Sequence, residues 1–171
     1  RVNSANIPPR ATTTTQVQLT LDSRATAPAV TPFNAANPLT YTGSTSQTEY
    51  DSLGNSHNMT MYFVKSATAG QYSMYTSLDG GTPSAATTLN FSNTGTLSTA
   101  MPITQSFALT NGAASPFSFP LDLTGTTQYG IGFAVNQLIQ DGYTSGRLTG
   151  VSVSAHGVLE GRYSNGKTDN L

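Results

Sequence analysis

Glu49, Asp51 and His57 lie close together in the chain and are the side chains whose types and spacing could carry chemistry. A carboxylate pair could serve acid–base catalysis in a β-rich hydrolase, or supply oxygen ligands to calcium. However, residues i and i+2 of an extended segment share a face without converging on one atom, and the further oxygen ligands that calcium needs are not evident. We therefore expect solvated or turn-capping carboxylates, with no cofactor and no enzyme site.

The chain has two histidines, His57 and His156. A zinc site or an activated nucleophile would require further ligands or a base partner, and none lies at motif spacing. We expect His57, beside Asn55, to be a hydrogen-bonded turn residue or a surface residue. His156 lies in a tight turn before Gly157, where histidine tolerates a positive φ better than most residues.

Composition excludes several classes of function. Charged residues make up 9% of the 171 residues, against about 25% in typical globular proteins. Seven Lys plus Arg against eight Asp plus Glu leave no basic field for nucleic acid. The absence of cysteine removes disulfides and thiolate metal sites. No apolar run approaches the roughly 20 residues of a membrane-spanning helix, so we expect neither nucleic acid nor membrane as a partner.

Alternation of apolar and polar residues predicts an all-β fold with no long helix. The predicted strands are 15–21, 58–65, 71–77, 87–92, 104–109, 115–123, 148–154 and 158–163. The best helical candidate, 132–140, is short and spaces its apolar residues as readily for a strand. The Pro- and Gly-containing stretch 28–47 is predicted to be an irregular surface excursion.

Three segments carry recognisable turn chemistry in a fixed order. The first is Leu21-Asp22-Ser23-Arg24-Ala25-Thr26, and the second is Tyr50-Asp51-Ser52-Leu53-Gly54-Asn55, which runs through His57 into a strand. The third is Gln140-Asp141-Gly142-Tyr143, leading to Gly161-Arg162-Tyr163-Ser164-Asn165-Gly166. Asp51 is expected to accept hydrogen bonds from backbone amides in a turn that sets the register of the next strand.

In this order the three segments resemble bacterial flagellar hook proteins across nearly the whole chain. The resemblance implies a structural subunit of the hook, the flexible coupling that transmits motor torque to the filament, located outside the cell. It also implies self-association in a helical tube, with the hook cap and hook–filament junction proteins as further partners. The residues expected to fix the shared turns and strand ends are Tyr50, Asp51, Ser52, Leu53, Gly54, Asn55, His57, Asp141, Gly142, Gly157, Tyr163, Asn165 and Gly166.

The resemblance also implies a domain organisation. Residues 1–11, with Pro8 and Pro9, are expected to form an extended linker. Residues 12–135 are expected to form an outer β-sandwich or barrel-like domain, and residues 136–171 part of a second, middle-layer β domain. In hook proteins that middle-layer domain is assembled from chain on both sides of the inserted outer domain, so the chain is expected to be an excised fragment that is monomeric alone.

Two other interpretations remain open from the residues. A cell-surface carbohydrate-binding or adhesin-like β-sandwich module would share the Thr-rich, cysteine-free, weakly charged composition. Its sugar face would come from tyrosines, although packing at the core edge is the simpler role for them: Tyr41, Tyr50, Tyr62, Tyr72 and Tyr75. A relative of the distal-rod proteins is the other alternative, because the third segment is the least specific part of the match.

Overall fold

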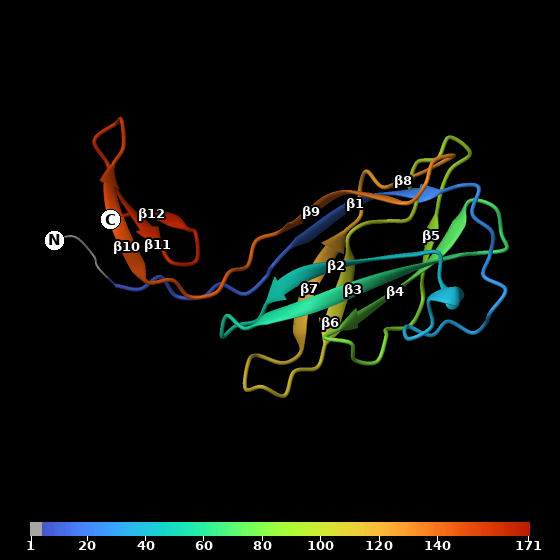
Figure 1. The fold of residues 1–171 in the computed structure, drawn as a ribbon, viewed down its shortest axis with the longest axis horizontal. Coiled ribbons are helices and arrows are strands. Elements are labelled where there is room, and N and C mark those ends of the chain that lie inside the picture. The colour runs from blue at the N-terminus through green and yellow to red at the C-terminus, as the bar shows by residue number, and fades with distance from the viewer. Residues whose placement is uncertain (1–4) are drawn as a thin grey trace.

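The computed structural model describes residues 5–171. They form a larger and a smaller β body joined by a narrow neck (Figure 1). Residues 5–171 contain twelve strands, one short 3-10 helix (η1, Pro38–Thr40) and no α-helix, which confirms the predicted all-β class. No helix in this part of the chain is long and apolar enough to cross a membrane. Residues 1–4 of the expected linker lie outside the described residues.

The first sheet of the larger body is an antiparallel meander in the order β2-β3-β4-β5. Its strands are β2 (Gly43–Tyr50), β3 (Ser56–Lys65), β4 (Gln71–Leu78) and β5 (Thr87–Asn90). Strand β3 pairs along its length with both neighbours, from Tyr50↔Ser56 on one side to Lys65↔Tyr72 on the other. The long central strand therefore fixes the register of the whole sheet.

The second sheet has the order β6-β7-β1-β8, in which β7 and β8 pair with opposite ends of β1. Strand β9 also pairs with β1, along most of its length. Its strands are β1 (Thr15–Asp22), β6 (Ile103–Phe107), β7 (Phe117–Asp122), β8 (Thr127–Tyr129) and β9 (Ala134–Gln140). Strand β1 runs parallel to β7 and β8 and antiparallel to β9. The first and last strands of the larger body are thus hydrogen-bonded neighbours.

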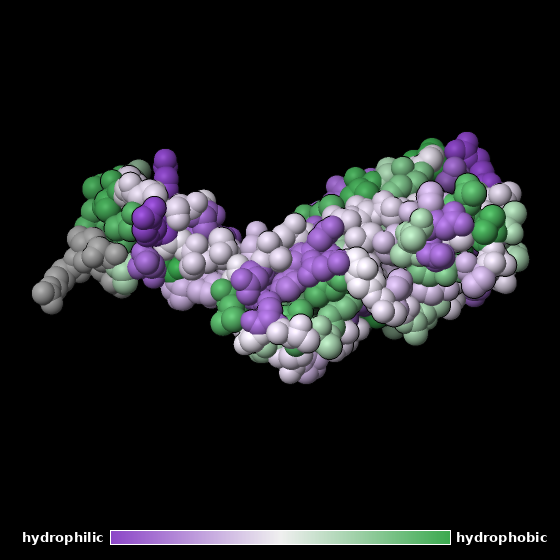
Figure 2. All heavy atoms as spheres, turned by 60° about the horizontal axis from the view of Figure 1, so that its bottom comes forward, coloured by the Kyte–Doolittle hydropathy of each residue, from purple (hydrophilic) through white to green (hydrophobic). Residues whose placement is uncertain are grey.

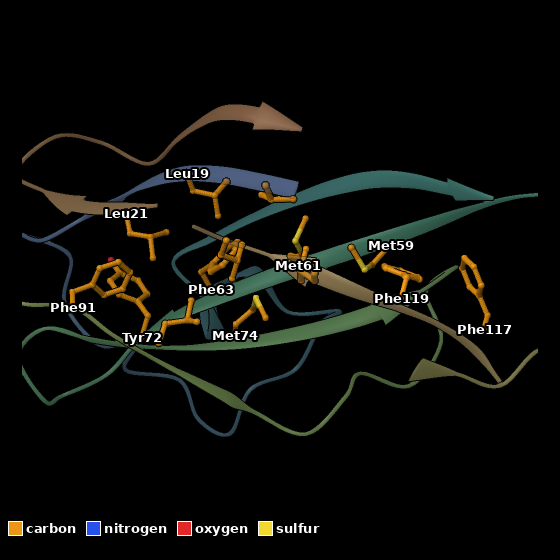
Figure 3. Packing of buried hydrophobic residues seen from close by; sticks show 14 residues of the cluster. Leu19, Leu21, Met59, Met61, Phe63, Tyr72, Met74, Phe91, Phe117 and Phe119 are labelled. Carbon is orange, nitrogen blue, oxygen red and sulfur yellow. The ribbon is translucent and has the colours of Figure 1, made fainter. Parts of the chain in front are cut away.

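Alternate side chains of the two sheets meet in one apolar core (Figure 3). Met59, Met61 and Phe63 of β3 are fully buried, and Leu19 and Leu21 of β1 face them. Burying a side chain of this size stabilises the fold by about 1.5–3 kcal/mol. Alternate apolar residues of β1, β3 and β7 face this core, in keeping with the alternation from which these strands were predicted, and the larger body is a sandwich rather than a closed barrel.

The smaller body is a three-stranded antiparallel sheet of β10 (Leu148–Val153), β11 (Leu159–Tyr163) and β12 (Thr168–Asn170). Val151 and Val153 of β10 lie opposite Gly161 and Leu159 of β11, so one face is largely apolar. Val151 is 49% and Val153 67% exposed. A three-stranded sheet with an uncovered apolar face is close to the lower limit of independent stability.

Two local predictions were wrong, and one ambiguous stretch is resolved. Residues 43–47, expected within an irregular excursion, begin strand β2, because threonine favours an extended chain even where one face of the strand is solvated. The stretch 132–140, whose spacing suited a strand as readily as a helix, contains strand β9, which gains its stability from pairing with β1. The positive φ expected for His156 belongs to Gly157, at +78°; histidine avoids that strain because glycine follows it.

Candidate functional site

The neck comprises residues 7–14 and 141–146, two antiparallel passages of chain that connect the bodies (Figure 1). Ile7 and Gly146 exchange backbone hydrogen bonds of 2.9 and 3.0 Å, and Arg10 and Tyr143 exchange two of 2.9 Å. Such paired bonds make the neck a two-stranded ribbon rather than two loose linkers. Asp141 and Gly142 of the sequence match lie in this ribbon, and Tyr50, Gly54 and Asn165 contact it.

The turn Asp51–Asn55 is organised around one buried carboxylate. Asp51 Oδ1 accepts the backbone N–H groups of Leu53 and Asn55, each at 2.9 Å. Its Oδ2 accepts the side-chain amides of Asn55 at 2.9 Å and Asn111 at 2.7 Å. These include the amide bonds expected of Asp51, and Asn111 adds a link to the segment between β6 and β7.

His57 bridges two carboxylates, so it is hydrogen-bonded as expected, but it lies at the start of β3 and is only 8% exposed, rather than in a turn or on the surface. Its Nε2 lies 3.1 Å from Asp51 Oδ2, and its Nδ1 lies 2.6 Å from Asp79 Oδ2. Burial lowers the pKa of His57, but the bonds to Asp79 and Asp51 outweigh it and raise the pKa above its ordinary value. Burial likewise opposes ionisation of Asp51, yet bonds from Asn55, His57 and Asn111 hold its pKa well below the usual range.

Gly54 brings this turn against the neck. Its φ is +82°, a region that residues with a Cβ enter only at a cost. A Cβ at Gly54 would lie 2.6 Å from Cβ of Pro9 and 3.3 Å from Cα of Thr144. The absence of a side chain thus lets the turn touch both passages at once.

The flanks of the turn add further connections. The backbone N–H of Thr12 donates to Tyr50 O at 2.8 Å, and Tyr50 N–H donates to Thr12 Oγ1 at 2.9 Å. On the other flank, Ser52 Oγ accepts the backbone N–H of Ala114 at 2.8 Å. Leu53, at the tip, is 56% exposed and makes no contribution to the core.

Asp141 and Gly142 tie the returning passage to the outgoing one. Asp141 Oδ1 accepts the backbone N–H groups of Thr13 at 2.7 Å and Thr14 at 3.1 Å, and its Oδ2 pairs with Arg10 at 2.9 Å. A Cβ at Gly142 would lie 2.6 Å from Thr12 Oγ1. Asp141 and Gly142 of the sequence match therefore allow the backbones of the two passages to approach each other closely.

The last matching segment joins the neck to the smaller body. Asn165 donates from Nδ2 to Thr144 O at 2.7 Å and accepts the N–H of Lys167 at 3.1 Å. Gly166, with φ +79°, closes the turn that follows buried Tyr163. Gly157 is different: it shapes the distant β10–β11 hairpin, and a Cβ there would meet nothing within 4 Å.

Glu49 is completely buried, so the expected solvated role for this residue was wrong. The hydroxyl of Thr15 lies 2.9 Å from each of its carboxylate oxygens. Burial raises the pKa of Glu49 to about 7, against the effect of bonds from Thr15 and Thr12, and the charge of Asp141 adds to the rise. A correct prediction of β2 would have indicated that Glu49 is buried. Glu49 pairs with His57, and His57 and Met59 point to the same inward face of β3.

The site therefore holds chain segments in place. The described residues contain no group of three or more His, Cys, Asp or Glu side chains that could hold a metal ion. Glu49 and Asp51 bind separate structural partners rather than converging on one point. What the arrangement can do is fix the angle and stiffness at which the larger body leaves the neck.

The tyrosines proposed as a sugar platform are engaged elsewhere. Phe33 stacks on Tyr75 with ring centroids 4.0 Å apart and 16° between the planes, and it also contacts Tyr62 and Tyr41. Tyr72 is in the core, where its hydroxyl donates to Asp22 O at 2.7 Å. Four of the five tyrosines therefore pack against aromatic side chains of the same chain.

Comparisons with known proteins agree on one family. Residues 20–143 match the family model described as the flagellar basal body protein FlaE D2 domain. The chain is 36% identical over 170 residues to the flagellar hook protein FlgE of Escherichia coli K12, covering 95% of this chain and 41% of that relative. For FlgE of Salmonella typhimurium the identity is 32%, with 91% and 40% covered. The chain thus spans about two fifths of these relatives.

A solved structure shares the fold. The crystal structure of Helicobacter pylori flagellar hook protein FlgE2 superposes with a TM-score of 0.55 at 17% sequence identity. The match covers 75% of this chain and 31% of that one. At this identity the likeness supports the β architecture alone.

Proposed function

Because this chain belongs to the flagellar hook protein family, we propose that it is a structural segment of a hook subunit and not an enzyme. The observation that carries the proposal is the neck together with the turn Asp51–Asn55 that contacts it: their matched residues bond backbone groups and fit glycines against neighbouring chain. Such a site has a mechanical use, because it sets how one body is held relative to another.

We propose that the larger body is the outer domain of the subunit and the smaller body part of its middle-layer domain. The boundary expected at 135 is better placed in the neck after Gln140, because β9 pairs with β1 as far as Thr15↔Gln140. The uncovered apolar face of β10 and β11 supports an incomplete second domain, since such a face is normally buried by further chain.

The surface suits contacts that must rearrange. No charged residue occurs between Asp79 and Asp122 in the sequence, and Figure 2 shows separate hydrophilic patches among weakly polar and hydrophobic areas. Shallow contacts between Thr, Ser, Ala and Gly side chains concentrate little energy in one register, whereas aromatic anchors and buried ion pairs do. Subunits of this kind can slide past one another while a bent tube rotates.

Self-association in a helical tube outside the cell follows from this proposal, with hook cap and hook–filament junction proteins as neighbours at the two ends. Immunogold labelling tests it directly. Antiserum raised against this chain should decorate the curved segment between cell body and filament in cells that make the parent protein. Gold confined to the cell envelope, or to the filament, would contradict the proposal, and specific binding on a glycan array would favour the adhesin-like alternative.

A further inference from the structure

Glu49 is an unusual residue for the interior of this molecule because no cation pairs with it among residues 5–171. It is 0% exposed. Both of its oxygens face the hydroxyl of Thr15. A buried carboxylate without a cationic partner is costly, so such a group favours its neutral form.

Its position is at the point where both passages of the neck join the larger body. Glu49 and Tyr50 end β2, and Tyr50 exchanges two hydrogen bonds with Thr12 of the outgoing passage. Thr15, which bonds Glu49, is the first residue of β1 and pairs with Gln140, the last residue of β9. The Glu49 carboxyl therefore bonds β1, the strand that follows the outgoing passage, and β1 in turn pairs with β9, the strand that precedes the returning passage.

We propose that Glu49 is a proton-operated lock on the neck: its neutral carboxyl holds the two passages against the larger body, and loss of the proton loosens them. When the proton leaves, a negative charge appears beside Thr12 and Thr15 with no counter-charge. Hydration is then what can stabilise the carboxylate. Water reaches the carboxylate only if the strand ends at Thr15 and Gln140 separate from β2. Most of residues 7–14 and 141–146 are exposed or half-buried, so little buried structure opposes such opening at the neck.

The other charged groups facing Glu49 do not neutralise it. His57, its partner across from β3, is engaged by Asp51 and Asp79. Arg10 of the neck is paired with Asp141, whose negative charge disfavours ionisation of Glu49 further. Asp51, two residues along, carries a charge of the same sign.

The pH range follows from the direction of the shift. The pKa of Glu49 is raised from 4.5 to about 7. A raised pKa means that the folded neck binds its proton more tightly than the open chain, so the stabilisation is complete below pH 4.5 and is lost as pH rises through 7. The lock is closed in mild acid and opens in mild alkali.

Pulsed EPR on the whole chain tests the proposal. Because the sequence has no cysteine, Thr88→Cys in the larger body and Ser152→Cys in the smaller, both exposed, place two spin labels without ambiguity. The label–label distance distribution should be narrow at pH 5.5 and broader at pH 8.5, with a midpoint near 7. Glu49→Gln, which mimics the neutral carboxyl, should stay narrow at both values.

Two controls keep the result specific. Glu160→Gln changes the other glutamate of the chain and should broaden with pH as the parent does. Thr15→Val removes the hydroxyl that bonds both oxygens of Glu49 and should move the midpoint of the broadening to higher pH. Circular dichroism reports whether Glu49→Gln folds, and Thr15→Val replaces it as the test variant if it does not. A width independent of pH in the parent, or equal broadening in Glu49→Gln, would overturn the proposal without bearing on the immunogold assignment.

Discussion

His57 Nε2 lies 3.1 Å from the fully buried Oδ2 of Asp51, so the start of β3 is bonded to the turn that precedes it. The same imidazole bonds Asp79, at the end of β4. Three chain segments thus share one charged network, and its protonation governs how firmly they are held.

The stability contributed by His57 should depend on pH. Its raised pKa means a contribution that is complete below 6.5 and is lost as pH rises through the folded value. The lowered pKa values of Asp51 and Asp79 give contributions that are lost as pH falls below 3.8. Urea unfolding of the parent and His57→Gln should therefore differ most between about pH 4 and 6.5, by about 2 kcal/mol. A difference that grows above pH 8 would show that the network is wrongly assigned.

Asp51→Ala should destabilise the larger body by about 3 kcal/mol, because it leaves His57 and the amides of Leu53, Asn55 and Asn111 without their acceptor. Asp169→Ala is the matched control: that side chain is exposed and accepts one neighbouring N–H. Its cost should stay within about 0.5 kcal/mol. Equal losses of unfolding free energy in the two variants, measured with urea, would show that Asp51 does not organise the turn.

Gly54→Ala should weaken the neck more than Gly80→Ala does. Both glycines have positive φ, +82° and +70°, so both substitutions cost about 1–2 kcal/mol of backbone strain. Only at Gly54 does the added Cβ meet Pro9 at 2.6 Å, whereas Gly80 faces open space. Trypsin should therefore cut after Arg10 faster in Gly54→Ala alone; similar rates in the two variants would place the turn away from the neck.

Added charge on the exposed strand surface should change the hook rather than the fold. Thr48, Thr88 and Thr104 are solvent-facing strand positions, and Thr→Lys at each should alter unfolding by less than about 0.5 kcal/mol. In a helical polymer the same change repeats at every contact, so a few tenths of a kcal/mol biases one register over another. Electron micrographs of detached mutant hooks should show altered curvature; unchanged curvature would remove this surface from bending.

The isolated chain should be a monomer. The stretch between Asp79 and Asp122 carries no charged residue and so offers no ion pairs, and we expect lateral contacts smaller than the roughly 1,200 Å² that stable interfaces bury. Sedimentation at micromolar concentration should give the mass of one 17.8 kDa chain. Fibres or a tight oligomer under those conditions would mean that this part alone carries assembly contacts.

The sequence was most informative where alternation is strong and least where polar residues face inward. Met59, Met61 and Phe63 predict their strand clearly because each of these inward positions carries a large apolar residue. Strand β2 carries Thr45, Gln47 and Glu49 at the equivalent positions, so its inward face does not look apolar, and Glu49 was misjudged with it. Pairing with β3 decides that face, and pairing is a long-range property.

The junction itself could be predicted only in pieces. The chemistry of Asp51 with the amides of its own turn is local and readable. The meeting of Gly54 with Pro9 and Thr144 joins residues far apart in sequence, and nothing in their local pattern indicates it. The same is true of His57 and Asp79, because the turn after β4 must fold back before the two can touch.

Thr15 and Gln140 are paired neighbours, so the larger body begins and ends at almost the same point in space. A unit with adjacent ends can be cut out and closed with a short turn, or exchanged for another of different size, without moving the chain on either side. Evolution and protein engineers therefore have the same freedom here: the larger body could be replaced by a module of another size while the paired neck stays as it is.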